Sequence, residues 1–164
     1  MPEDWPLELK DICGSLVTPL NIHNIMAHHP ELLNAWMPFR NHVVGGSSLS
    51  ARHRELIILR TAHICQASYE WLHHVERGLA AGLSREEIYR VKEGANADGW
   101  QNDEAALLNA VDDCHGHNQI EDRTMKSLCG YFNAQQQLDI LVTVGMYRTL
   151  ALIIKTYDVP MEET

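Results

Sequence analysis

The sequence of 164 residues lacks two features that would assign it to large classes of proteins: a Cys-x-x-Cys pair and a concentration of positive charge. Its cysteines stand singly, which is typical of reduced, buried thiols and not of a disulfide framework; they are Cys13, Cys65, Cys114 and Cys129. There are 13 basic and 22 acidic residues, and the formal net charge is −9. Because phosphate binding needs a basic surface, we expect no nucleic-acid partner.

The chain also shows no leader sequence and no uninterrupted apolar run. Its first residues contain neither the basic nor the apolar segment of a secretory signal peptide. The most apolar stretch, 138–154, is interrupted by Asp139 and Arg148, so it predicts a core helix and not a membrane span. Together with the single thiols, these features predict a cytoplasmic protein without a membrane partner.

What the sequence does contain is a series of helix start and stop signals, which predict an all-α bundle. Ser50, Ser84 with Glu87, and Asn133 with Gln136 have the pattern of helix caps, and Gly82 suits the position after a helix end. We expect helices over about 19–28, 31–42, 51–64, 68–81, a stretch from 85, 102–114, 121–128 and 134–156. The length fits a single domain, 1–164, with its core at about 19–157.

Three proton-carrying side chains, Glu55, Glu70 and His74, lie among apolar residues in the part of the chain that we expect to be buried. Burying a charge is costly unless it is paired or neutralised. The presence of these three residues at buried positions therefore indicates a structural or functional role. Ser68 is the predicted N-cap that puts Glu70 in the first turn, and His74 shares its helical face at i+4.

These side chains can cooperate only if the chain bends between their helices. In one straight helix Glu55 and Glu70 would be about 22 Å apart along the axis. A bend at 65–68 would bring the three side chains together, although no glycine or proline occurs there.

The motifs Arg54-Glu55-x-x-Ile58-Leu59-Arg60, Tyr69-Glu70-Trp71-x-x-His74 and Ala81-Gly82-Leu83-Ser84-x-Glu86-Glu87-Ile88 resemble the carboxymuconolactone decarboxylase family, which shares its all-α fold with alkylhydroperoxidase D. The resemblance extends upstream to 24–33 and downstream to 105–112 and 144–147. It implies that the chain turns between the two helices, and that the protein is a homo-oligomer, a trimer or hexamer, or else a dimer.

In the peroxidase branch of this family, a Cys-x-x-Cys pair precedes the histidine. The resemblance places Ala67 and Glu70 at the two thiol positions and Glu55 at a relay glutamate. We therefore predict a cofactor-free acid–base enzyme, of the decarboxylase type, that acts on a small organic acid or lactone. In this hypothesis His74 is the acid/base, Glu70 and Glu55 orient it, and Tyr69 donates to an oxyanion; Arg60 or Arg54 anchors the substrate carboxylate.

Several alternatives stay open at this stage. Thiol peroxidase chemistry would need Cys65 to act without a partner, and a non-catalytic oligomeric binding protein could keep the same fold. Glu55 could form a structural ion pair with Arg60 or Arg54, and Glu70 an ordinary i, i+4 pair with His74. The ten histidines do not follow a metal-ligand spacing, so no metal site is predicted.

Overall fold

Three helices begin at the side-chain caps that the sequence predicts. At α4 (Ala51–Ile64), Ser50 Oγ accepts a hydrogen bond from the His53 amide at 3.1 Å. At α6 (Arg85–Arg90), Ser84 and Glu87 form a reciprocal capping box. At α9 (Ala134–Thr156), Asn133 and Gln136 form another. These caps satisfy amide groups that the first helical turn leaves without a partner.

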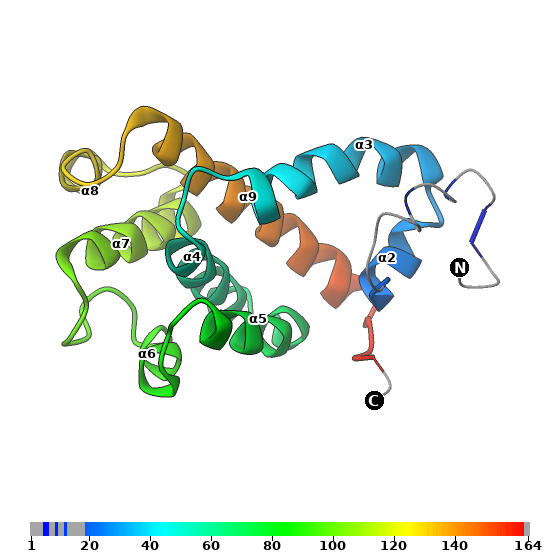
Figure 1. The fold of residues 1–164 in the computed structure, drawn as a ribbon, viewed down its shortest axis with the longest axis horizontal. Helices are drawn as coiled ribbons and strands as arrows, with labels where there is room; N and C mark the ends of the chain where they lie inside the picture. Colours follow the sequence, from blue (N-terminus) through cyan, green and yellow to red (C-terminus); the bar gives the residue numbers. More distant parts are fainter. Residues whose placement is uncertain (1–4, 7–8, 10–11, 13–18, 163–164) are drawn as a thin grey trace.

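The computed structural model describes residues 5–6, 9, 12 and 19–162, and that part of the chain contains helices and no strand (Figure 1). This confirms the predicted all-α class. The remaining elements are α2 (Asn21–Met26), α3 (Pro30–Asn41), a short π-helical turn η2 (His42–Gly46), α5 (Ser68–Ala80), α7 (Asn102–His117) and α8 (Asp122–Leu128).

Some predicted helix ends are wrong. Helix α2 begins at Asn21 and not at Pro19; Thr18, its predicted cap, lies outside the described residues. Helix α7 continues through Gly116, because a glycine in a helix costs only about 1 kcal/mol, and it ends at Asn118 with a φ of +57°. Ser68 is the first residue of α5 and not its cap.

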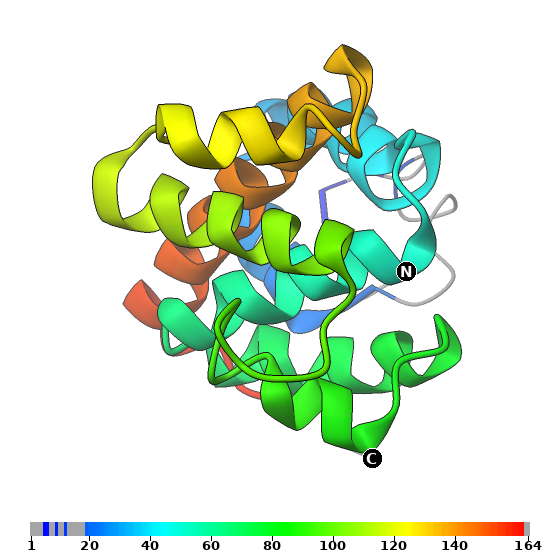
Figure 2. The same cartoon turned by 90° about the vertical axis from the view of Figure 1, so that its left-hand side faces the viewer.

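Helix α4 lies at the centre of the bundle, where it contacts α5, α7 and α9. Figure 2 shows α7 between α8 and α4, with α5 on the other side of α4. Leu56, Ile57 and Leu59 of α4 are fully buried in the largest hydrophobic cluster, which also takes in buried residues of α7 and α9. This packing fixes the position of the α4 side chains.

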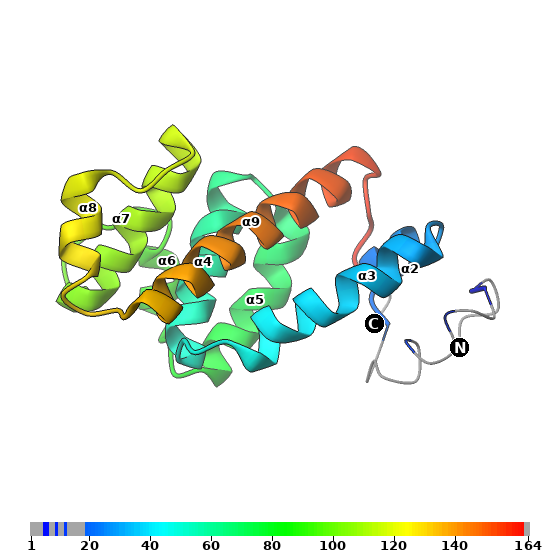
Figure 3. The ribbon, with the colours of Figure 1, turned by 90° about the horizontal axis from the view of Figure 1, so that it is seen from above.

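Helix α9 crosses over α4 and α5 and extends toward α2 and α3, as Figure 3 shows. Its far end packs with α2 and α3 in a second cluster, to which Leu33, Met37 and Ile154 belong. Among the described helices, α9 alone is long enough and, with a mean hydropathy of 1.5, apolar enough to cross a membrane, but a core helix passes the same test. In this fold it is a packed helix that joins the two ends of the molecule.

Candidate functional site

The site depends on a sharp turn between α4 and α5. Cys65 ends α4, and Gln66 adopts a left-handed conformation with a φ of +53°. The Ala67 amide donates to the Ala62 carbonyl at 2.9 Å and closes the turn. The chain therefore reverses at 65–67, as the acid–base hypothesis requires, and α4 and α5 pack side by side.

The turn brings Glu55 of α4 against His74 of α5. Glu55 Oε2 lies 2.6 Å from His74 Nδ1, and both side chains are about 5% exposed. A carboxylate can only accept, so we assign the proton to Nδ1, which leaves Nε2 as a free acceptor. Burial lowers the pKa of His74, while the bond to Glu55 works in the opposite direction. The imidazole is therefore neutral at physiological pH and oriented by Glu55.

Glu70 is a buried carboxyl group whose oxygens have no hydrogen-bond partner among the described residues. It is 3% exposed, and neither carboxyl oxygen meets a donor in the described part of the chain. The alternative of an i, i+4 hydrogen-bonded pair between Glu70 and His74 is therefore not formed, and no hydrogen bond from Glu70 orients the imidazole. Burial raises the pKa of Glu70 to about 8. This carboxyl group is mostly protonated at neutral pH and is available as a proton donor.

Tyr69 is held from outside the site by the C-terminal segment. Its hydroxyl donates to Glu162 Oε1 at 2.5 Å, and the same oxygen accepts the Asn21 amide at 2.8 Å. His73 Nε2 lies 2.7 Å from the other oxygen of Glu162. Glu162 therefore packs against α2 and α5. The Tyr69 proton is thus engaged by Glu162, which weakens its predicted role as an oxyanion donor.

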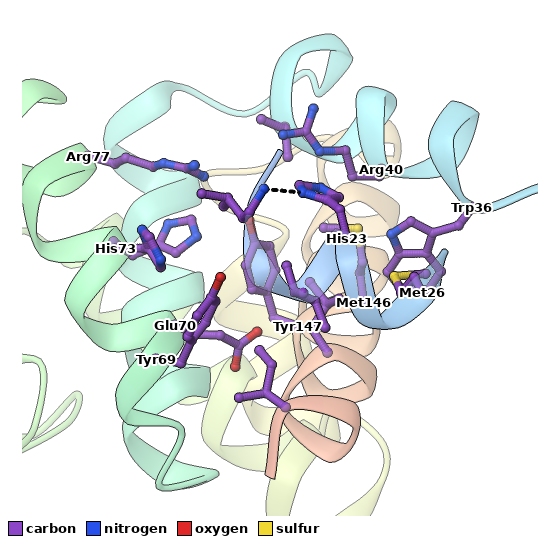
Figure 4. A pocket seen from close by; sticks show the side chains of 16 residues that line it. His23, Met26, Trp36, Arg40, Tyr69, Glu70, His73, Arg77, Met146 and Tyr147 are labelled. Carbon is purple, nitrogen blue, oxygen red and sulfur yellow. Dashed lines mark hydrogen bonds between the residues drawn. The ribbon is translucent and has the colours of Figure 1, made fainter. Parts of the chain in front are cut away.

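A hollow opens beside His74 and Glu70; its empty space, with the open solvent at its mouth included, is about 560 Å³. Figure 4 shows the Glu70 carboxyl turned into it from α5, with Tyr147 of α9 beside it. Most of its wall is apolar, contributed by Leu20, Ile22, Met26, Trp36, Val44, Met146, Leu150 and Ile154. A second depression adjoins it and is lined by Glu55 and Arg54. The arrangement is that of a ligand pocket with a few polar groups.

The two arginines predicted to anchor a substrate carboxylate have different positions. Arg60 does not line the hollow, because its guanidinium binds both Asp112 oxygens at 2.6 and 3.1 Å. Arg54 lines the second depression, and its Nε is 3.7 Å from Glu55 Oε1. Of the two proposed structural ion pairs with Glu55, only this loose contact to Arg54 forms.

The sequence analysis missed several polar residues of the site, above all Arg40, Arg77 and Tyr147; His23 and His73 also line the hollow. Arg40 and Arg77 line both hollows, and Tyr147 packs edge-on against His74 with ring centroids 5.0 Å apart. Arg77 follows His74 by three residues on α5, so its spacing could have indicated it. Arg40 and Tyr147 come from α3 and α9, and no local pattern links them to the site.

Cys65 faces away from the hollow. It lines a separate surface depression with Arg148 and Lys155. Burial raises the pKa of its thiol, and the nearby Glu70 raises it further. A thiol peroxidase needs the opposite, a stabilised thiolate. Among residues 19–162, no three His, Cys, Asp or Glu side chains gather as metal ligands.

The model of the carboxymuconolactone decarboxylase family matches residues 30–113. The chain belongs to this family. The match covers α3 to most of α7 and so includes Glu55, Glu70 and His74. No curated protein matches the chain.

Several solved structures of other proteins have the same fold as this chain. A protein of unknown function from Agrobacterium tumefaciens, described as a candidate antioxidant defence protein AhpD, aligns with a TM-score of 0.77 at 24% identity over 86% of this chain and 97% of that one. A peroxidase-related protein from Silicibacter sp. TM1040 gives 0.82 at 19%, over 98% and 87%. A variant of the debrominase Bmp8, in complex with 2,3,4-tribromopyrrole, gives 0.78 at 15%, over 95% and 86%. The all-α, alkylhydroperoxidase D-like fold is confirmed.

Proposed function

We propose that this family member is a cofactor-free acid–base enzyme acting on a small organic acid or lactone, by decarboxylation or a related proton transfer. The observation that carries the proposal is the buried contact of 2.6 Å between Glu55 and His74 at the wall of the hollow. A carboxylate that orients a neutral imidazole is a common arrangement for general base catalysis.

In a proton transfer, His74 Nε2 is the base. It takes a proton from the carbon next to a substrate carbonyl, and the electrons of the C–H bond move toward the carbonyl oxygen. Glu55 stabilises the imidazolium that forms. Protonated Glu70 donates a hydrogen bond to the oxygen on which negative charge develops. Return of the proton from His74 to a different carbon completes an isomerisation.

In a decarboxylation, the bond between the substrate and its carboxylate carbon breaks, and carbon dioxide leaves. The electron pair stays on the substrate as an enolate. The proton that the substrate carbon then needs comes from the Glu70 carboxyl, which is replenished from water. The isomerisation uses a base at His74 and an acid at Glu70, and the decarboxylation uses the same acid at Glu70. These roles agree with the different environments of the two groups.

The oxidoreductase alternative receives less support. The sequence has no Cys-x-x-Cys pair, and Cys65 does not line the hollow. The relatives include a debrominase as well as peroxidase-related proteins, so this fold is not restricted to one reaction. If thiol chemistry were the true activity, Cys65→Ser would abolish peroxide reduction. We expect that variant to leave proton transfer unchanged.

The test uses NMR in deuterium oxide with a panel of lactone acids and keto acids, because deuterium uptake at carbon reports both reactions. We expect His74→Ala and Glu55→Gln to lower kcat by about 100-fold or more. Glu70→Gln keeps the shape but removes the proton, and it should have a loss of similar size. Trp71→Phe, a change outside the hollow, is the matched control. Full activity in both His74→Ala and Glu70→Gln would refute the proposal.

A further inference from the structure

Two guanidinium groups border the site without a negative partner among the described residues. Arg40 of α3 and Arg77 of α5 line both hollows, and neither has a carboxylate within 4.0 Å in the described part of the chain. The one hydrogen bond between either guanidinium and a described residue joins Arg40 to the neutral Asn41 side chain at 3.1 Å. Both side chains are half-buried, so each has given up part of its hydration.

Other half-buried arginines of the chain are satisfied differently. Arg52 binds Glu104 and Glu87, and Arg60 binds Asp112. Arg90 lies over the Trp100 ring and donates to a carbonyl. Partly desolvated cations without a partner are costly. Burial lowers the pKa of Arg40, and charge repulsion from Arg77 acts in the same direction. Arg40 and Arg77 therefore differ from the other half-buried arginines in having no such partner. A bound anion would supply the missing partner for both.

Tyr147 adds a third donor at the same place. It is one of the five residues shared by the two hollows, with Arg40, Arg77, His74 and Val44. The two cations and the Tyr147 side chain therefore line the same part of the wall in both hollows. In the described residues the hydroxyl has no hydrogen-bond partner. Two guanidinium groups and one hydroxyl on the lining that the two hollows share are donors of the kind that bind a carboxylate.

The other residues that line the hollow indicate what the rest of a carboxylate ligand should be. Beyond the cations most of the wall is apolar, with Ile22, Met26, Trp36 and Leu150, and the imidazoles of His23 and His73 also line it. At its inner part the buried Glu70 carboxyl points into the space with both oxygens free of partners. Such a group needs a polar atom of a ligand, since nothing in residues 19–162 serves it.

We propose that the hollow binds monocarboxylates with an apolar body, held by Arg40, Arg77 and the Tyr147 hydroxyl, with a carbonyl or lactone oxygen against Glu70. This inference rests on the proposed acid–base function and names its substrate class: an aryl or medium-chain carboxylate with an oxygen several carbons away. Short dicarboxylates lack the apolar body and fit less well.

Calorimetric titration tests the binding half directly. We expect 3-phenylpropionate to bind and its neutral amide to bind at least about tenfold more weakly. In the series from acetate to hexanoate, affinity should rise by up to about fourfold for each methylene group. Equal binding of the acid and the amide, or no binding of either, would overturn the proposal.

Variants then assign the cations. Arg40→Gln and Arg77→Gln should each weaken 3-phenylpropionate binding by about tenfold or more, and Arg77→Lys should restore part of it. Tyr147→Phe should show a smaller loss. Arg85→Gln, which removes an exposed charge on α6, is the matched control and should bind normally. Normal binding in both glutamine variants would refute the carboxylate site.

The two proposals fail in different ways. His74→Ala should bind 3-phenylpropionate like the wild type while losing deuterium exchange. If the arginine variants bind normally but His74→Ala loses exchange, only the carboxylate site is wrong. If binding depends on both arginines but His74→Ala keeps exchange, only the acid–base assignment is wrong.

Discussion

Two buried carboxyl groups of this chain have opposite surroundings. Asp139 accepts hydrogen bonds from the amide and hydroxyl of Ser48 at 2.7 and 2.6 Å, and lies 2.7 Å from His42 Nε2. Burial would raise the pKa of Asp139, but these bonds together hold it below its usual value. Glu70 has no such bonds. Asp139 therefore serves the structure, whereas Glu70 costs stability and is a functional candidate.

The cost of Glu70 should depend on pH. Its carboxyl has a pKa of about 8 in the folded protein against 4.5 unfolded, so the unfolded chain loses this proton first as pH rises. Wild-type stability should therefore fall between about pH 4.5 and pH 8, and then level off. Glu70→Gln is neutral throughout, so its advantage in Tm should grow over that range.

The measurement is thermal unfolding of wild type and Glu70→Gln at half-unit steps from pH 4.5 to 8.5. Near pH 4.5 the two Tm values should be close, and at pH 8 the variant should be higher by about 5 °C or more. Glu76→Gln, which changes an exposed carboxyl on the same helix, is the control. A Tm difference that does not change with pH would contradict a raised pKa at Glu70.

Site residues that are polar on an otherwise apolar helical face could be predicted from the sequence. The other site residues could not. Glu55, Glu70 and His74 interrupt apolar helical faces, so their burial was predictable. Arg40 looks like any surface arginine in α3, and Tyr147 like any core aromatic in α9. Their place at the site depends on how α3 and α9 pack against α5, which is a tertiary property.

At the scale of elements, the turn between α4 and α5 shows what local signals miss. Helix starts were predictable where a side chain caps them, as at Ser50 and Asn133. The reversal at 65–67 has no glycine or proline; it uses a left-handed Gln66, and packing of α5 on α4 holds it. Only the family resemblance indicated this turn, because tertiary packing overrides the preference of the residue itself.

This strain leads to a prediction for Gln66. The side chain is exposed, so Gln66→Gly removes the left-handed strain without loss of packing. We expect the free energy of unfolding to rise by about 0.5–1 kcal/mol, measured by urea denaturation. Gln66→Val, with a branched Cβ that disfavours this conformation, should lower it. If Gln66→Gly is less stable than wild type, the turn is not strained.

The site draws on the whole molecule and not on one motif. The family model covers 30–113, so Tyr147 and Glu162 come from the part of the chain beyond the match. Glu162 links three elements around the site. Its side chain joins the C-terminal segment to Tyr69 on α5 and to the first amide of α2. The residues next to the hollow at that end, Leu20 and Ile22, flank this same amide.

Removal of this link should therefore loosen α2 and leave the α4–α5 pair intact. Glu162→Ala leaves the Tyr69 hydroxyl and the Asn21 amide without their acceptor, and we expect a loss of about 1–3 kcal/mol in the free energy of unfolding. Amide hydrogen exchange should become faster in the first turn of α2 and stay slow around Glu55 and His74. Met161→Ala, at an exposed neighbour, is the control and should change neither. Unchanged exchange at Asn21 in Glu162→Ala would mean that α2 is held by its own packing, through Ile22 and Met26 in the second cluster, and not by the C-terminal segment.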